Sequence, residues 1–495
     1  NKQLVVLVHG WSVRTTETYG GLPQRLKREA KAQGLAIDVR NIWLSKYISF
    51  HNEVRLEDIS RAFEAALQHE LGEQLKAGQR LSIISHSTGG PVVRDWLQRY
   101  YLRPGRKTTP LNHLIMLAPA NFGSALAQLG KTRISRLKAW FEGVEPGLGV
   151  LDWLELGSPE SWALNCEWMD QGDDLLSTRG VWPFVLTGQT IDRHFYDHVN
   201  SYTGEVGSDG VVRSASANLN FSYVRLQQQL PDGRSTPDYL PLHSKKAQQA
   251  PETAFALVPG RAHSGDDIGI MRSVPANTGQ HPTVDAIVAC LKVNDKRSYH
   301  SLKEAFAAQT AAVQAQELVE EIDLPGPYNR MEFRDPCSQL MFRVRDDTGL
   351  LIRDFDLIFT AGKQNSADRL PPKFFIDRQK NHRDAGTLTY YLNYSRMMGA
   401  PAVVRDGEEL RPALPGSDGF GLRIVPYPLD GFVHYIPAVL HVTKANLQKF
   451  IKPNATTLVD IVLHRVLHRG VYRLAKNGGK DDFTQQPTGK IVGRE

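Results

Sequence analysis

The chain has 495 residues, of which 41% are hydrophobic and 23% are charged. These values are typical of globular proteins and exclude disordered, collagenous and fibrous classes. The length predicts two or three domains, because ordinary domains have roughly 100–200 residues. No uncharged apolar stretch of about 18 residues occurs, so we expect no transmembrane helix.

The net charge of +6 comes from the C-terminal third of the chain. From Asp323 onward, 25 Lys and Arg residues stand against 19 Asp and Glu residues. The basic residues are scattered, which predicts a mildly basic surface and no nucleic-acid-binding stripe. Three cysteines, Cys166, Cys290 and Cys337, are too few and too far apart to predict a disulfide framework or a zinc site. We expect buried small side chains or one incidental bridge.

The N-terminal part alternates strands and helices. Its strands are continuous apolar runs, as expected where helices cover both faces of a sheet. This alternation predicts a parallel α/β sheet. The predicted strands are 2–9, 36–43, 80–85, 113–118, 182–187 and 253–259, and the predicted helices are 56–75, 91–102 and 282–292.

The alternation breaks between residues 124 and 180, where amphipathic helical pieces are separated by Gly and Pro. Four of the eight tryptophans lie here: Trp140, Trp153, Trp162 and Trp168. We expect a helical lid inserted after the fourth strand, because Trp-rich amphipathic helices suit a surface that meets lipid. The alternative is a helical cap that packs as ordinary core.

The Ala-, Gln- and Glu-rich stretch 299–321 predicts a connecting helix. After it, the sequence pattern changes to short strand-like runs separated by turn signals. We therefore divide the chain into an α/β part, 1–297, a helical linker, 298–322, and a β-rich accessory part, 323–495. The accessory part is predicted to be a β-sandwich that either docks to an anionic membrane or presents a rigid surface to a partner. Its predicted strands are 341–344, 351–360, 387–394, 421–425, 433–442 and 458–466.

The strongest local signal is residues 84–90, Ile-Ser-His-Ser-Thr-Gly-Gly, which follow a predicted strand and precede a predicted helix. This is the context of a nucleophile elbow, the G-x-S-x-G turn, with Ser87 at its centre. The positions two residues to either side must be small, and Ser85 and Gly89 satisfy this, although Ser85 replaces the usual glycine. The alternative is an ordinary Ser- and Gly-rich loop.

A serine nucleophile needs a base and a group that orients the base. In α/β-hydrolases the chain order is serine, acid, histidine, with each residue in a loop after a later strand. Asp209 follows the strand at 182–187, and His263 directly follows the strand at 253–259, so we predict these two as acid and base. The rival acids are Asp192 and Asp197, and the rival bases are His194, His198, His243 and His281.

The oxyanion of an ester intermediate needs two N–H donors. One is expected from Thr88, which follows the nucleophile at the start of a helix. The other is expected from the loop after the first strand, His9-Gly10-Trp11. Gly10 allows a close backbone approach, so Trp11 N–H is the predicted donor.

Five segments in this order resemble the lipases of the α/β-hydrolase family. The set is similar to bacterial triacylglycerol lipases, to lipase-like deacylases of glycosylphosphatidylinositol and to the phospholipase effectors that bacteria inject through type VI secretion. The resemblance covers residues 2–291, does not extend to Tyr299 and beyond, and implies a lid over the nucleophile. The segments are LVHGW (7–11), SHSTGG (85–90), APANFGS (118–124), SDGVV (208–212) and GRAHSG (260–265).

We therefore expect a serine hydrolase that cleaves carboxylic esters of lipids at a membrane surface, of the lipase or phospholipase A type. No cofactor is expected. Some related lipases hold a structural Ca²⁺ near the histidine loop, where Asp266 or Asp267 could serve. The alternatives are a soluble carboxylesterase or thioesterase, and a binding protein on an inactive hydrolase fold.

The resemblance also bears on where the protein acts. It implies secretion or delivery to another cell's envelope, with an immunity or inhibitor protein or a secretion partner. The chain begins at Asn1 without an initiator Met, so we expect that the native start lies elsewhere, and a removed signal peptide stays open.

Overall fold

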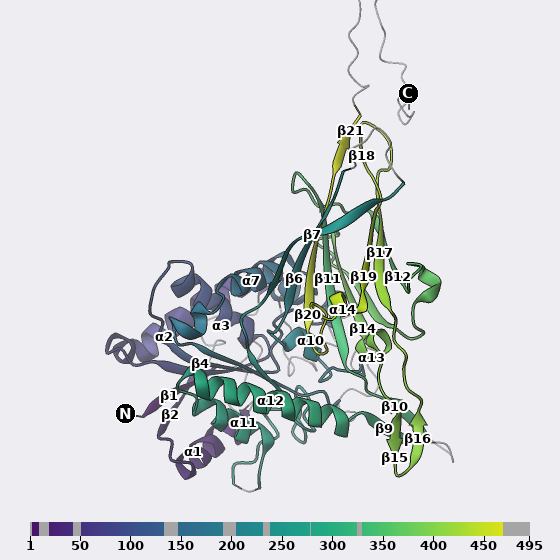
Figure 1. The fold of residues 1–495 in the computed structure, drawn as a ribbon. Helices are drawn as coiled ribbons and strands as arrows, with labels where there is room; N and C mark the ends of the chain where they lie inside the picture. Colours follow the sequence, from purple (N-terminus) through teal and green to yellow (C-terminus); the bar gives the residue numbers. More distant parts are fainter. Residues whose placement is uncertain are drawn as a thin grey trace, which may run out of the picture.

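Two sheets organise the computed structural model (Figure 1). One is a six-stranded sheet near the N-terminus, and the other is a nine-stranded sheet formed mainly by the C-terminal third. The structure describes residues 2–8, 19–42, 51–132, 147–191, 204–230, 238–277, 279–323 and 329–468.

The first sheet is parallel throughout, in the order β2-β1-β3-β4-β5-β8. Its strands are β1 (Gln3–Val8), β2 (Ile37–Ile42), β3 (Leu81–His86), β4 (Leu111–Leu117), β5 (Trp182–Thr187) and β8 (Ala254–Leu257). Every residue of β3 and β5 is buried, as expected for strands covered on both faces. The α/β-hydrolase sheet expected from the sequence is confirmed.

Helices cover both faces of this sheet. On one face, α1 and α11 pack in one apolar core; on the other, α2 and α3 pack in a second core (Figure 1). Their bounds are α1 (Leu22–Ala32), α2 (Leu56–Lys76), α3 (Gly89–Leu97) with a π-helical turn at Gln98–Leu102, and α11 (Pro282–Leu291).

Helices are inserted between β4 and β5, as predicted. Those within the described residues are α4 (Ala127–Thr132), α6 (Leu148–Leu154), α7 (Pro159–Asp170) and α8 (Asp174–Ser177). The described tryptophans do not face outward. Trp153, Trp162 and Trp168 are 4%, 3% and 1% exposed, because the second sheet lies against these helices; Arg343 stacks on the Trp162 ring at 4.4 Å. The alternative interpretation, a cap packed as core, therefore holds for these three residues. Trp140 lies outside the described residues.

The second sheet has the order β12-β17-β19-β7-β6-β20-β11-β14-β13. It curls around its own apolar core. The ring centroids of Phe359 in β12 and Tyr390 in β14 are therefore 4.8 Å apart, although the two strands lie near opposite ends of the strand order. Its strands are β6 (Ser222–Gln228), β7 (Leu240–Gln249), β11 (Cys337–Asp346), β12 (Phe355–Ala361), β13 (Phe375–Lys380), β14 (Thr387–Asn393), β17 (Gly419–Pro426), β19 (Ala438–Thr443) and β20 (Thr456–Leu463).

The β-rich, sandwich-like character expected of the C-terminal part is thus confirmed, with its layers joined in one curled sheet. Strands β6 and β7 come from the stretch assigned to 1–297, yet they pair between β19 and β20. The domain boundaries at 297 and 322 stay predictions.

Short strand pairs lie at the two ends of the second sheet. In Figure 1 the β18–β21 pair lies at the end farthest from the first sheet, and the β9–β10 and β15–β16 pairs lie at the opposite end. The bounds are β9 (Val319–Asp323), β10 (Asn329–Phe333), β15 (Val403–Arg405), β16 (Glu408–Arg411), β18 (Val433–Tyr435) and β21 (Arg465–Leu467), with short helices α10 (Ser214–Ala217), α13 (Tyr394–Met398) and α14 (Lys444–Leu447) and a 3₁₀ turn at Ala367–Arg369.

The long helix α12 (Lys296–Gln316) corresponds to the predicted connecting helix. It lies along β8, the last strand of the first sheet, and hydrogen-bonds to its backbone. Ala254 N–H donates to Tyr299 Oη at 3.0 Å, Leu257 N–H donates to Thr310 Oγ1 at 3.0 Å, and Gln309 donates to Leu257 O at 2.8 Å. These side chains satisfy backbone groups that an uncovered sheet edge would expose.

Candidate active site

Ser87 occupies a strained turn between β3 and α3. Its φ of +53° lies in the left-handed region, which non-glycine residues rarely adopt. The turn also needs small neighbours. A Cβ added at Gly89 would lie 3.2 Å from Ser85 Cβ, and one added at Gly90 would lie 2.7 Å from Pro119 Cβ. The strand, the turn and the helix together form the elbow that the sequence predicts.

The three residues predicted as nucleophile, base and acid lie together. Ser87 Oγ is 3.1 Å from His263 Nε2, and His263 Nδ1 is 2.9 Å from Asp209 Oδ2. The Asp209 side chain is fully buried and that of His263 is 3% exposed. Geometrically this is a serine–histidine–acid chain in which each group can orient the next.

The Asp209 carboxylate is fixed by its own loop. Its Oδ1 accepts the N–H groups of Val211 at 3.0 Å and Val212 at 2.8 Å, which leaves Oδ2 facing His263. His263 N–H also donates to Asp209 O at 3.0 Å. The two loops are therefore joined through backbone as well as side chains, a contact that sequence reasoning did not find.

His86 also lies beside His263, and sequence reasoning did not single it out. The two rings are 4.7 Å apart, and His86 Nε2 lies 3.1 Å from the backbone oxygen of His263. His86 can thus support the loop that carries the predicted base. The signal available in the sequence was its position next to Ser87.

The rival bases that the structure describes, His281 and His243, do not lie beside Ser87 or Asp209. His281 accepts the Thr283 N–H at 3.3 Å and its Nε2 lies 3.2 Å from Arg261. Burial, followed by the positive charge of Arg261, lowers the pKa of His281 to about 4. His243 is exposed on β7 of the second sheet. Asp192, Asp197, His194 and His198 lie outside the described residues.

The predicted oxyanion donors are only partly described. Thr88 is buried at the N-terminus of α3, where backbone N–H groups lack partners within the helix. Trp11 lies outside the described residues. Both assignments stay predictions.

The expectation of a structural calcium gains no support from the described loop. Asp266 Oδ1 pairs with Arg272 Nε at 2.5 Å. Within the described ranges, no group of three His, Cys, Asp or Glu side chains is arranged to hold a metal ion. The three cysteines are unpaired, and burial raises the pKa of Cys166 to about 11 and that of Cys337 to about 12.

The second sheet reaches the Asp209 loop through Arg213, whose side chain is 1% exposed. Arg213 Nε and Nη2 donate to Glu205 at 2.7 and 2.8 Å, and Nη2 also donates to Asp377 of β13 at 2.6 Å. Nη1 donates to Gln339 of β11 at 3.1 Å. Burial raises the pKa of the Glu205 carboxyl, although the facing Arg213 opposes the rise. The loop that carries the predicted acid is therefore anchored to the accessory sheet.

Comparison with solved structures gives a match over the whole chain. Phospholipase PlaB from Legionella pneumophila is 41% identical, and the match covers 99% of this chain and 100% of that one, with a TM-score of 0.85. The chain belongs to the PlaB phospholipase family. The structure of PlaB in complex with thio-NAD matches with the same identity, coverage and TM-score.

The similarity of this chain to other solved structures is weaker. The lipase BlEst2 from Bacillus licheniformis is 20% identical over 44% of this chain and 79% of that one, with a TM-score of 0.32. No family model and no curated protein matches the chain. In the part of the chain that the structure describes, no helix has both the length and the apolarity needed to cross a membrane.

Proposed function

We propose that this chain is a phospholipase that cleaves the carboxylic ester bonds of lipids with Ser87 as nucleophile. The observation that carries the proposal is the hydrogen-bonded chain Ser87–His263–Asp209 at a nucleophile elbow. Membership of the PlaB phospholipase family supports the lipid substrate. We further propose the phospholipase A type, which removes an acyl chain from the glycerol backbone.

In the proposed reaction, Ser87 Oγ attacks the ester carbonyl carbon while His263 Nε2 takes the hydroxyl proton. The carbonyl oxygen becomes an oxyanion, for which we propose the Thr88 and Trp11 N–H groups as donors. The bond to the alcohol then breaks, and His263 returns the proton to the departing oxygen. Water, deprotonated by His263, attacks the acyl-enzyme and releases the fatty acid and Ser87. Asp209 holds the imidazole and stabilises its charged form.

Where the protein acts is a separate part of the proposal. We infer that it works at a membrane surface, with the basic excess after Asp323 attracting anionic lipid. Secretion or delivery to another cell's envelope, and an immunity, inhibitor or secretion partner, stay predictions from the sequence resemblance.

The test is product analysis on phospholipid vesicles. The full chain should release fatty acid and lysophospholipid, and Ser87→Ala should lower the rate roughly 10⁴-fold. Ser177→Ala, at an exposed serine, is the matched control and should keep the rate. Hydrolysis of short soluble esters or acyl thioesters without any hydrolysis of phospholipid would contradict the proposal and favour a carboxylesterase or thioesterase.

A further inference from the structure

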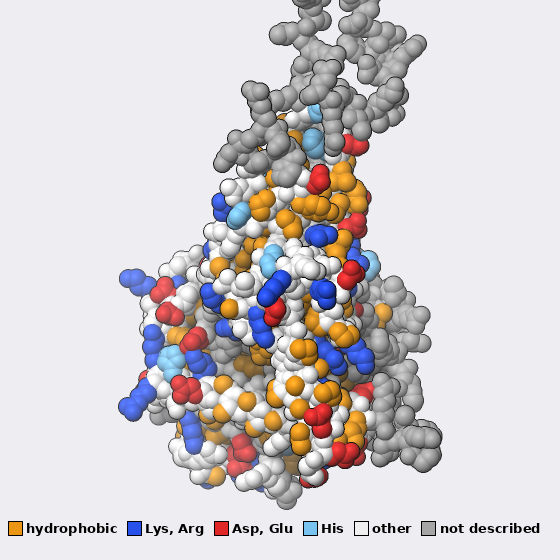
Figure 2. Space-filling view, turned by 45° about the vertical axis from the view of Figure 1, so that its right-hand side comes forward, with side chains coloured by type: hydrophobic (Ala, Val, Ile, Leu, Met, Phe, Trp, Pro, Cys, Tyr) orange, Lys and Arg blue, Asp and Glu red, His pale blue; other side chains and the backbone are white. Residues whose placement is uncertain are grey.

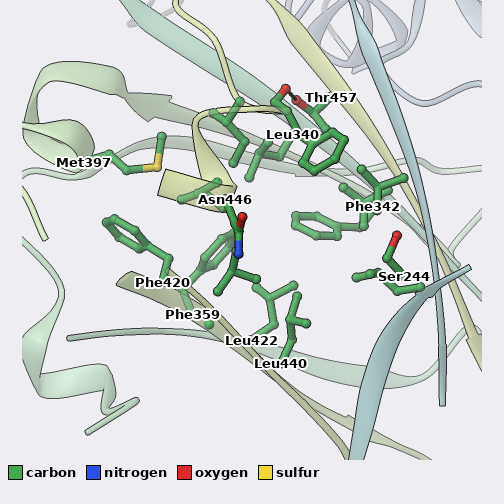
Figure 3. A pocket seen from close by; sticks show the side chains of 18 of the residues that line it. Ser244, Leu340, Phe342, Phe359, Met397, Phe420, Leu422, Leu440, Asn446 and Thr457 are labelled. Atoms are coloured by element: carbon green, nitrogen blue, oxygen red, sulfur yellow. Dashed lines mark hydrogen bonds between the residues drawn. The ribbon is translucent and has the colours of Figure 1, made fainter. Parts of the chain in front are cut away.

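The curled second sheet encloses a cavity of about 340 Å³ that the proposed reaction does not use (Figure 3). Its wall is almost wholly apolar and comes from several strands. Protein interiors leave few voids larger than a water molecule, whereas ligand pockets occupy roughly 300–1,000 Å³. The cavity therefore has the size of a binding site. Its wall includes Leu340, Phe342, Phe359, Phe420, Leu422 and Leu440.

The wall offers little to a polar occupant. Thr457 lines the cavity, but its hydroxyl already donates to Phe450 O at 2.9 Å. Asn446 also lines the cavity, and its Oδ1 accepts from Lys449 Nζ at 2.9 Å. A buried water needs two to four polar partners, so the interior favours hydrocarbon over water.

The strands β19 and β7 separate beside the cavity. These strands pair only at Ala438 with Leu240 and at Val439 with Pro241. Pro241 has no N–H to continue the ladder. Beyond this point β7 continues along β6 alone, and β19 continues along β17. Ser244 of β7 and Leu440 of β19 both line the cavity past the last pair, so no backbone ladder closes the wall between these two strands.

One lysine lies beside this break in the ladder. Lys449 Nζ donates to Oδ1 of the lining residue Asn446 at 2.9 Å, and Lys449 O accepts from Gln249 of β7 at 3.0 Å. Lys449 is exposed. An exposed ammonium group beside an apolar slot suits a molecule with one hydrocarbon chain and an anionic head.

We propose that this cavity binds one acyl chain of an anionic amphiphile, with its head at Lys449. Cleavage of an anionic phospholipid releases two such molecules, a free fatty acid and an anionic lysophospholipid. The supply of ligand rests on the proposed function, but binding itself does not. The volume accommodates one chain rather than the two of an intact phospholipid.

The test measures binding with Ser87→Ala protein, so that no turnover is needed. Dodecanoate and dodecanoyl-lysophosphatidylglycerol are titrated calorimetrically below their micelle concentrations. At least one should bind saturably at one site per chain, and the tighter one identifies the source of the chain. Leu440→Trp, which fills the cavity, should weaken binding at least about tenfold, whereas Leu350→Trp, at a residue 59% exposed, should leave binding unchanged.

A second variant covers the case in which Leu440→Trp fails to fold. Lys449→Glu, on the surface, should weaken dodecanoate binding about threefold or more and leave dodecanol binding unchanged. Absence of saturable binding, or equal binding by folded Leu440→Trp, would overturn the proposal. These results are independent of hydrolysis, so a protein that binds but does not cleave contradicts only the proposed function.

Discussion

Immediate neighbours hold Ser87 and Asp209 in position. The left-handed turn at Ser87 needs the small residues around it, and Asp209 is oriented by two backbone N–H groups. A left-handed conformation costs a non-glycine residue on the order of 1–3 kcal/mol. Such strain persists where the surrounding structure enforces it, as β3 and α3 do here.

Asp209→Asn tests the acid. The amide cannot hold the imidazole in the required tautomer or stabilise its charge, so turnover should fall roughly 10⁴-fold while the protein stays folded. Steady-state kinetics on a soluble ester measure this, with the exposed Asp267→Asn as control. Turnover near the wild-type level would move the acid role to Asp192 or Asp197.

The sequence was sufficient to predict that these three residues lie together, because each follows a strand whose apolar run is easy to recognise. It could not predict His86 or the backbone contact between Asp209 and His263, because both depend on how two loops distant in sequence approach each other. Trp11 illustrates a different limit, since the assignment rests on a short pattern and lies outside the described residues.

At the scale of elements, prediction succeeded where burial is uniform. Strand β5 has the predicted bounds, Trp182–Thr187, because both of its faces are buried and the run is continuously apolar. Strand β7 was missed because most of its residues are exposed and its sequence, LPLHSKKAQQ, is polar. Its place in the second sheet follows from long-range pairing with β6 and β19, which local pattern does not encode.

The contact between the accessory sheet and the Asp209 loop predicts an effect on activity. Asp377→Asn removes one of the two carboxylates that hold the buried Arg213, so the loop should be less well positioned. We expect kcat to fall several-fold with KM nearly unchanged, while the exposed Asp368→Asn keeps wild-type kinetics. If kcat were unchanged in a folded Asp377→Asn protein, the accessory sheet would not position the acid.

The inserted helices are predicted to act as core. Trp153→Ala should lower the free energy of unfolding by about 3–5 kcal/mol, as expected for a buried aromatic side chain. Activity per folded molecule should change equally on vesicles and on a short soluble ester. Leu148→Ala, at a residue 44% exposed, is the control. Unchanged stability with a loss confined to vesicles would restore a lipid-facing role.

At the scale of the whole molecule, the second sheet contacts the Asp209 loop of the α/β part. The surface carries both hydrophobic and charged side chains. Figure 2 shows hydrophobic side chains among Lys and Arg over the part of the molecule that contains the second sheet. Exposed apolar residues there include Tyr427, Leu429, Phe432 and Leu467. Composition predicted the basic excess, but only the three-dimensional structure shows which apolar side chains are exposed.

Stability should depend on pH through buried neutral histidines. His113 lies 2.7 Å from both Ser82 Oγ and Val293 O, and burial lowers its pKa to about 4. The unfolded chain binds this proton below about pH 6.5, whereas the folded chain does so only near pH 4. Stability should therefore fall between pH 6.5 and 4, by up to about 3 kcal/mol for this residue.

The thermal midpoint measured across this pH range checks the expectation. His113→Gln should be less stable than the wild type at pH 7 but should lose less stability on acidification. His281, whose pKa is also lowered to about 4, should leave a remaining slope in that variant. Parallel pH profiles for the wild type and His113→Gln would contradict the assignment.

The central claim, that Ser87 is the activated nucleophile, is tested most directly by a fluorophosphonate, which reacts covalently with activated serines. Mass spectrometry of the labelled full chain should place the adduct on Ser87 and not on the neighbouring Ser85. Labelling should be lost in Ser87→Ala and strongly slowed in His263→Ala. Labelling of another serine, or a wild-type labelling rate in folded His263→Ala, would contradict the account.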